Sequence, residues 1–258
     1  MKIFDCFIFN HEIELLEIRL NILNDYVDKF VITEGDMTFS GFPKESHFLN
    51  NKERFSKWED KIILNQINIP EFNSPWHREI YSRNAIVNLD IFNDDDLILT
   101  SDLDEIPNPE VLEHASEWVS DDVHFTFQQS CYSYWLNNLY SDKWFGTRAS
   151  THKYLKNTTV DDIREGTEDE SKISGSIITN GGWHFTYLGN EDHIRQKINS
   201  FCDRHYDVPE VTDNISENLK NGKDVLNRHH IKYHRVDLDD SFPQYILDNQ
   251  EKYSYWIK

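Results

Sequence analysis

The chain has 258 residues, of which 38% are hydrophobic and 14% aromatic, and this is enough to bury one sizeable core. Its formal charge of -20, from 46 acidic and 26 basic residues, argues against a polyanionic partner such as nucleic acid or an anionic membrane surface. No apolar run reaches the roughly 20 residues of a membrane span, and the start "MKIFDCFIFN" lacks the order of a signal peptide. We therefore expect a single cytoplasmic domain over residues 1–258.

The first hundred residues have the pattern of an α/β sheet. "KIFDCFIF" is a near-continuous apolar strand, and "HEIELLEIRLNIL" follows with Ile13, Leu16, Leu20 and Leu23 at helical spacing. "DKFVITEG" is a second strand, so these three elements predict a right-handed βαβ unit with parallel strands. "DKIILNQI" and "DDLILTS" predict two further strands, with a helix at about residues 79–89 between them. We expect an open, twisted, mostly parallel sheet flanked by helices.

The second half has a less regular pattern. "VHFTFQQ" and "GGWHFTYL" predict aromatic strands, a helix is expected from Glu191 to Phe201, and "FPQYILDNQEKYSYWI" predicts a last helix. The very polar segment from Thr158 to Ser176 predicts a long surface loop. We assign nucleotide binding to about residues 1–110, and acceptor binding and catalysis to about residues 111–258.

The stretch "SDLDEIPNPE" places acids directly after a predicted buried strand. In an open α/β sheet the ligand crevice lies beyond the carboxyl ends of the strands. Asp102 and Asp104, at positions i and i+2, suit a hard divalent cation, Mn²⁺ or Mg²⁺, that also takes phosphate oxygens. Such a cation would neutralise a leaving diphosphate. The other interpretation is a solvated turn, with its acids placed near the N-terminus of the following helix.

Several blocks of the chain resemble glycosyltransferase family 17. They include "FDCFIFNHEIELLEIRLNIL", "VDKFVITEGDMTFSG", "DDLILTSDLDEIPNPE" and "GGWHFTYLG", and they come in that family's order over nearly the whole chain. This is the family of the β-1,4-mannosyl-glycoprotein β-1,4-N-acetylglucosaminyltransferases and their bacterial and viral relatives. The resemblance implies a GT-A fold with a DxD motif at a strand end, a UDP-sugar donor such as UDP-N-acetylglucosamine, a glycan acceptor, and inversion at the sugar carbon.

Three residues outside the DxD stretch are candidates for metal binding and catalysis. His184 lies on the opposite face of its strand from Trp183 and Phe185, and it would add a nitrogen ligand to a cation held by Asp102 and Asp104; a structural histidine is the alternative. Glu191 and Asp192 begin a helix, where the N-terminus favours carboxylates. An inverting transfer needs a base for the acceptor hydroxyl, so Asp192 or Glu191 is the candidate base, and two simple helix-start acids are the alternative.

Donor binding requires cations for the diphosphate and polar edges for the nucleotide. Arg78 and Arg83 lie on the helix that leads to the DxD strand, and Arg83 would reach a phosphate or the uracil, unless it forms a surface ion pair. Glu34 ends the second strand and would accept hydrogen bonds from the uracil or ribose. Asp102 completes this set of donor-binding candidates.

Two other classes of protein share parts of this pattern. A metal-dependent phosphoesterase would also use Asp102 and Asp104, although it usually adds His and Asp ligands from several strand ends. A non-catalytic carbohydrate-binding protein is the third class. Release of phosphate without an acceptor would indicate the phosphoesterase. Sugar binding that is unaffected by chelator and nucleotide would indicate the carbohydrate-binding protein.

Overall fold

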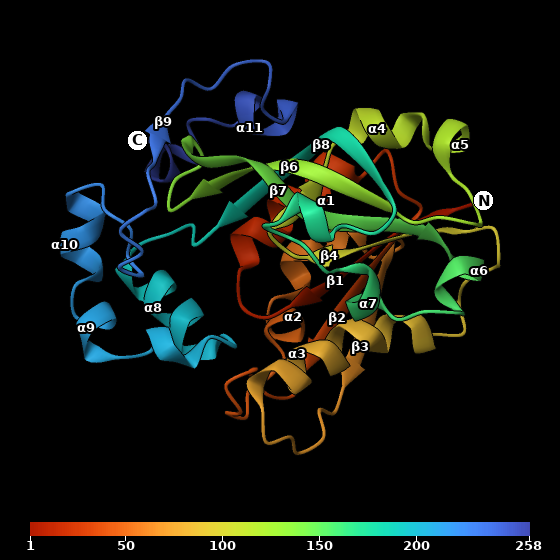
Figure 1. The fold of residues 1–258 in the computed structure, drawn as a ribbon, viewed down its shortest axis with the longest axis horizontal. Helices are drawn as coiled ribbons and strands as arrows, with labels where there is room; N and C mark the ends of the chain where they lie inside the picture. The colour runs from red at the N-terminus through yellow and green to blue at the C-terminus, as the bar shows by residue number, and fades with distance from the viewer.

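One nine-stranded sheet runs through both halves of the chain (Figure 1). The computed structural model describes all residues from 1 to 258. The strands are β1 (Ile3–Phe9), β2 (Lys29–Gly35), β3 (Ile62–Ile67), β4 (Leu97–Asp102), β5 (Glu105–Pro107), β6 (Phe125–Ser133), β7 (Asn138–Thr151), β8 (Ser176–Thr186) and β9 (His234–Arg235). Their order across the sheet is β3-β2-β1-β4-β7-β6-β8-β5, with β9 beside β7.

The strands of the first half are parallel, as predicted. β1 pairs in parallel with β2 and β4, and β2 pairs in parallel with β3. Beyond β4 the sheet becomes mixed, because β7 pairs antiparallel with both β4 and β6 while β6 and β8 are parallel. The carboxyl ends of β1, β2 and β4 therefore lie at one edge, where the acidic stretch follows β4.

Short helices surround this sheet. They are α1 (Ile13–Leu23), α2 (His47–Asn50), α3 (Pro75–Asn84), α4 (Pro109–Glu113), α5 (Ala115–Trp118), α6 (His152–Leu155), α7 (Val160–Ile163), α8 (Glu191–Ser200), α9 (Pro209–Thr212), α10 (Ile215–Lys220) and α11 (Gln244–Asp248), with 3-10 helices at 52–58, 85–88, 170–172, 204–206 and 254–256. None of these helices has the length and apolar character needed to cross a membrane. In Figure 1, α8, α9 and α10 gather at one end of the sheet.

The central strands are buried on both faces, which explains their near-continuous apolar sequences. On β1, Phe7 and Phe9 pack with α1 in the largest apolar cluster, whereas Phe4 and Cys6 pack on the other face with Ile163 of α7. A third cluster joins α8 and α10 to the aromatic side chains that follow β6 and β8.

Two predicted helices have different bounds in the structure. The helix expected at residues 79–89 begins earlier, at Pro75, and ends at Asn84 before a 3-10 turn, because proline suits the first turn of a helix. The expected C-terminal helix is only α11, followed by a separate 3-10 turn at 254–256. The Asn249 side chain donates to the Tyr245 carbonyl at 2.7 Å, and such a bond competes with continuation of the helix.

The prediction of a surface loop from Thr158 to Ser176 is wrong in its first part. Thr159 and Asp162 form a reciprocal capping box that begins α7. Val160 and Ile163 are buried, and Arg164 is only 8% exposed. The fourteen-residue strand β7, which precedes this segment, has no counterpart among the predicted strands. Together β7 and α7 position Arg164 next to Asp102, the last residue of β4.

Candidate active site

The acidic stretch comprises the end of β4, a two-residue turn and the short strand β5. Asp102 is the last residue of β4 and lies opposite Ile8 of β1. After Leu103 and Asp104 the chain enters β5, which pairs antiparallel with β8 and sets Glu105 opposite His184. This pairing brings the first and second halves of the chain together at the DxD motif. The interpretation as a merely solvated turn does not hold, because Asp104 and Glu105 are 6% and 0% exposed.

Arg19 of α1 holds the backbone of this stretch. Its guanidinium forms an ion pair with Asp5 of β1, at 2.6 Å from Nη2 to Oδ1, and both side chains are fully buried. Nη1 donates to three backbone carbonyls, those of Asp102, Leu103 and Glu105, at 2.8–3.0 Å. Nη2 also donates to Ser101 Oγ at 2.6 Å. A buried ion pair thus fixes the turn that carries both aspartates.

Asp102 faces two guanidinium groups. Arg83 of α3 donates from Nη2 to Oδ2 at 3.0 Å, and Arg164 donates from Nη2 to the same oxygen at 2.8 Å. Burial alone would raise the pKa of Asp102, but the charges of Arg164 and Arg83 outweigh it and hold that pKa below its usual value. Arg83 also binds Glu79, at 2.8 Å. Arg83 thus forms a largely buried ion pair with Asp102, and its role at a phosphate or the uracil stays a prediction.

Glu105, the third acid of the stretch, is fully buried and bonded on both oxygens. Its Oε1 accepts from Trp144 Nε1 at 2.8 Å and from Arg164 Nη2 at 2.6 Å, and its Oε2 accepts from Arg164 Nη1 at 2.8 Å. Gly146 of β7 allows this packing, since a Cβ there would stand 2.8 Å from the Glu105 carboxyl carbon. Glu105 thus acts as the anchor for Arg164.

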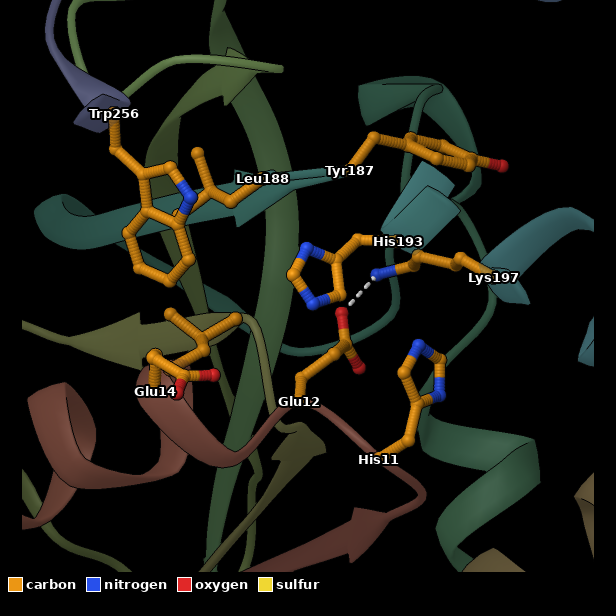
Figure 2. A pocket seen from close by; sticks show the side chains of 9 residues that line it. His11, Glu12, Glu14, Tyr187, Leu188, His193, Lys197 and Trp256 are labelled. Carbon is orange, nitrogen blue, oxygen red and sulfur yellow. Dashed lines mark hydrogen bonds and ion pairs between the residues drawn. The ribbon is translucent and has the colours of Figure 1, made fainter. Parts of the chain in front are cut away.

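Asp104 lies between His184 and Lys197. Lys197 Nζ is 2.7 Å from Asp104 Oδ2, and His184 Nε2 is 3.3 Å from the same oxygen. Burial opposes ionisation of Asp104, yet Lys197 and His184 hold its pKa well below the usual value. Lys197 also donates to Glu12 at 2.8 Å, and Figure 2 shows this second contact. A single ammonium therefore bridges two carboxylates that come from the loop before α1 and the turn after β4.

Two of the three predicted ligands of a divalent cation, Asp104 and His184, lie in direct contact. Two cis ligands of an octahedral ion with bonds of about 2.1 Å stand about 3 Å apart, which is close to the 3.3 Å between Asp104 Oδ2 and His184 Nε2. Lys197 supplies a positive charge at this position. Asp102 is turned toward Arg83 and Arg164, and no group of three or more His, Cys, Asp or Glu side chains forms a complete ion site. The structure thus brings together Asp104 and His184 of the three predicted ligands.

Two of the predicted donor-binding residues make other contacts. Glu34 ends β2 as expected, but its carboxylate accepts from Lys44 Nζ, from Ser46 Oγ, and from the backbone amides of His47 and Phe48 at the start of α2. Arg78 donates to the carbonyls of Phe39 and Phe72 and does not reach Asp102. Both side chains order the loop that follows β2.

The two candidate bases lie at the start of α8. Asn190 caps this helix by accepting from the His193 amide. Glu191 pairs with Arg195 at 2.8 Å, and Asp192 is exposed with no side-chain bond. Neither carboxylate contacts Asp104, His184 or Lys197. The face of α8 turned toward the site carries Lys197, one turn after His193.

Arg19, Arg164 and Lys197 are the cations of the site that the sequence analysis missed. Arg19 had a signal, because it lies among Leu15, Leu16 and Leu23 on the buried face of α1 while Asp5 interrupts an apolar strand. Arg164 and Lys197 had none, since each is one cation in a polar segment.

Two hollows flank the acidic stretch. One lies at the carboxyl ends of β1 and β2, is lined by Asn10, Thr33 and Lys44 among others, and holds about 280 Å³, part of it open to solvent. The other lies between α1, the end of β8, α8 and the C-terminal turn, and holds about 400 Å³, part of it open to solvent. Lys197 lines the second hollow and reaches Asp104, so this hollow adjoins the DxD motif.

Similarity to known proteins identifies the family. No curated protein matches the chain. Among solved structures, S. aureus TarS 1-349 matches at 14% identity with a TM-score of 0.43, over 76% of this chain and 64% of that one. The galactosyltransferase LgtC in complex with donor and acceptor sugar analogs matches at 12% identity with a TM-score of 0.39, over 63% of this chain and 62% of that one. This chain thus spans slightly less than two thirds of either structure.

These structural likenesses are too weak to carry the assignment, which rests on the family model. That model, glycosyltransferase family 17, matches residues 1–258, the entire length of the sequence. The "SDLDEIP" and "GGWHF" blocks, which suggested the same family, form the paired strands β5 and β8 and the residues beside them. The chain belongs to glycosyltransferase family 17.

Proposed function

We propose that this protein transfers a sugar, N-acetylglucosamine, from a UDP-sugar to a hydroxyl group of a glycan acceptor, with inversion at the sugar carbon. Membership of glycosyltransferase family 17 supports the class of reaction. The observation that carries the proposal is the convergence of Asp104 and His184, 3.3 Å apart, beyond the carboxyl ends of parallel strands. That is where open α/β sheets bind their ligands.

A divalent cation, Mn²⁺ or Mg²⁺, is part of this proposal. Asp104 and His184 would hold it, with Asp102 as the third ligand. When bound, the cation supplies positive charge to the diphosphate of the donor. In the structure both oxygens of Asp102 accept from Arg83 or Arg164, so Asp102 would give up part of these bonds on binding the cation, and Arg19 fixes the backbone of the turn. Lys197 has Glu12 as a second anion, so it has a partner when Asp104 binds a cation.

The hollow at the carboxyl ends of β1 and β2 is the proposed site of the nucleotide. Asn10, Thr33 and Lys44 line it with polar groups, and Ser82 of α3 lies at its edge, one residue before Arg83. Glu34 binds Lys44 at 2.8 Å and thereby orders this wall. We therefore assign Glu34 and Arg78 to shaping the nucleotide site, whereas Arg83 and Asp102 lie where the diphosphate would enter.

A thermal-shift panel tests the proposal, since a ligand that binds only the folded state raises the melting temperature. We expect UDP to stabilise the protein only with Mn²⁺ or Mg²⁺ present, and UDP-N-acetylglucosamine to stabilise it more than UDP-glucose or UDP-galactose. Asp104→Asn should abolish the cation-dependent shift, because a neutral amide is a poor ligand for a hard cation. Undiminished UDP binding in excess EDTA would refute the role of the cation.

The same samples separate the two other classes of protein. A phosphoesterase would release inorganic phosphate from the nucleotide sugar without any acceptor. A carbohydrate-binding protein would bind free sugars equally well with and without UDP and chelator. Release of UDP that depends on an added sugar acceptor is the result expected of a transferase.

A further inference from the structure

The hollow beside Lys197 has the composition of a sugar-binding cleft. Leu15 of α1, Leu188 after β8 and Trp256 of the C-terminal turn form an apolar side, and Glu12, His193 and Lys197 form a polar side. Figure 2 shows Trp256 and Leu188 on one side and Lys197 on the other. Ligand pockets combine apolar walls with a few placed polar groups, and a pyranose ring offers both C–H faces and hydroxyl groups. The side chains that line the cleft therefore suit a sugar ring in their chemistry.

His11 provides a second observation that points to a ligand. Its side chain also lines the cleft, and its Nδ1 is buried with no hydrogen-bond partner in the protein. Burial lowers the pKa of His11 to about 4, so the ring is neutral near pH 7. Buried polar atoms are normally satisfied. Because this nitrogen is sealed from solvent, a sugar hydroxyl would become its partner only together with a movement of the His11 ring toward the cleft.

The cleft lies next to the proposed cation site, with Lys197 between them. The Lys197 ammonium is 2.7 Å from Asp104 Oδ2 and 2.8 Å from Glu12 Oε1. The two carboxylate oxygens are thus no further apart than the sum of these distances. A sugar in the cleft would present its hydroxyl beside the cation proposed to lie between Asp104 and the diphosphate.

Two carboxylates line the cleft, those of Glu12 and Glu14. Glu14 pairs with Arg54 at 3.0 Å, whereas Glu12 is the one that Lys197 joins to Asp104. Its Oε1 binds Lys197, while its Oε2 makes no hydrogen bond within the protein. Glu191 and Asp192 do not line the cleft. A general base must lie within hydrogen-bond reach of the proton that it takes, so position favours Glu12 over both acids at the start of α8.

We propose that this cleft binds the acceptor sugar ring and that Glu12 takes the proton of the attacking hydroxyl; the inference rests on the proposed transferase function. The hydroxyl oxygen forms a bond to the anomeric carbon of the donor as the bond from that carbon to the β-phosphate oxygen breaks. UDP leaves with the electron pair of the broken bond, and the proton passes to the Glu12 carboxylate. No oxidant or other reactant is needed.

Two variants test the base and the cleft separately. Glu12→Gln should lower kcat for UDP release from UDP-N-acetylglucosamine by about 10²- to 10⁴-fold, with a methyl pyranoside of mannose, galactose or N-acetylglucosamine as the acceptor. The UDP-induced thermal shift with Mn²⁺ should stay at its wild-type size. Glu53→Gln, an exposed acid on the 3-10 helix at 52–58, is the matched control for loss of one negative charge.

The second variant fills the cleft. His193 is exposed, so His193→Trp should fold, and it should abolish saturation transfer from the protein to those methyl pyranosides in NMR spectra recorded with UDP and Mn²⁺. Asn199→Trp places the same side chain at another exposed position of α8 and should leave the signals unchanged. Equal pyranoside signals in His193→Trp and wild type would overturn the assignment of the cleft.

The outcomes distinguish this inference from the function on which it rests. If Glu12→Gln binds UDP and turns over normally, the assignment of Glu12 as the base is wrong, while the proposed function stands. The same holds if turnover is lost only in Glu191→Gln or Asp192→Asn. Loss of UDP binding in Glu12→Gln also contradicts the assignment of Glu12 as the base, because Glu12 would then act on the cation site through Lys197. Failure of wild-type protein to bind UDP overturns the proposed function as well.

Discussion

Replacement of Arg19 by lysine is expected to destabilise the protein through the DxD turn. Arg19 makes six hydrogen bonds: two to Asp5, one to Ser101 Oγ, and three to the carbonyls of Asp102, Leu103 and Glu105. A lysine ammonium keeps the charge opposite Asp5 but concentrates its donors at one atom. A lysine side chain cannot reproduce the planar set of donors of the guanidinium group, so the three hydrogen bonds to backbone carbonyls are lost.

The size of the effect follows from these bonds. At about 1 kcal/mol net for each lost hydrogen bond, Arg19→Lys should lower the free energy of unfolding by about 3 kcal/mol. That is a large share of the roughly 5–15 kcal/mol of a typical domain, yet small enough for the variant to fold. Urea unfolding followed by tryptophan fluorescence measures it. Arg54→Lys is the matched control, because Arg54 is 35% exposed in its ion pairs with Glu14 and Glu17, and exposed pairs contribute at most about 1 kcal/mol.

A double variant separates the ion pair from the carbonyl bonds. Replacing a buried ion pair by apolar side chains is often neutral or stabilising, so Asp5→Leu with Arg19→Met would be tolerated if the pair were the only contribution. We expect this double variant to remain clearly less stable than wild type, since the carbonyls stay unbonded. If Arg19→Lys lost no more stability than Arg54→Lys, the reasoning about the turn would be refuted.

Three further predictions concern other parts of the site and of the fold. Gly146→Ala should lower stability by about 1–3 kcal/mol and reduce transfer, because its Cβ would stand 2.1 Å from Gln129 Oε1 and 2.8 Å from the Glu105 carboxyl carbon; a wild-type melting temperature would contradict this. Arg164→Met should lose donor binding more than Arg83→Met, measured by UDP thermal shift, because Arg164 alone bonds both Asp102 and Glu105. Asp224→Asn should lose the same stability at pH 7 and at pH 5, and this loss should shrink only as the pH falls below 3.8, the ordinary pKa of the group. Burial would raise the pKa of Asp224, yet Arg228 and Tyr233 hold it low. The contribution of the carboxylate is therefore present above the unfolded pKa and disappears as the pH falls through the lower folded pKa. Urea unfolding of both proteins at pH 7, 5 and 3 measures that difference.

The first half of the fold could be predicted from the sequence because its signals are local. β1, α1 and β2 follow one another with apolar residues at strand and helix spacing, and two buried faces give the continuous runs that parallel strands show. Topology rules then order them. β7 lacks such a run, since its first part, "NLYSDKW", is polar and partly exposed, and only its pairing with β4 and β6 makes it a strand.

The site was predictable only in part, because its acids and its cations come from distant positions. Asp102 and Asp104 were singled out from a strand end and His184 from its strand face, and their role as metal ligands stays a prediction. Arg164 binds Glu105 across 59 residues and Lys197 binds Asp104 across 93. One cation in a polar segment carries no local sign of such a partner, so only the folded chain identifies it.

The charge balance of the site bears on how an anionic donor would bind. Around the DxD motif, the carboxyl groups of Glu12, Glu79, Asp102, Asp104 and Glu105 outnumber the cations of Arg83, Arg164 and Lys197. Each of these cations already pairs with a carboxylate, and the whole chain has a formal charge of -20. A diphosphate would therefore meet no surplus of positive charge. A divalent cation on Asp104 and His184 would supply that surplus, so we expect removal of the cation to weaken UDP binding more than removal of any single arginine.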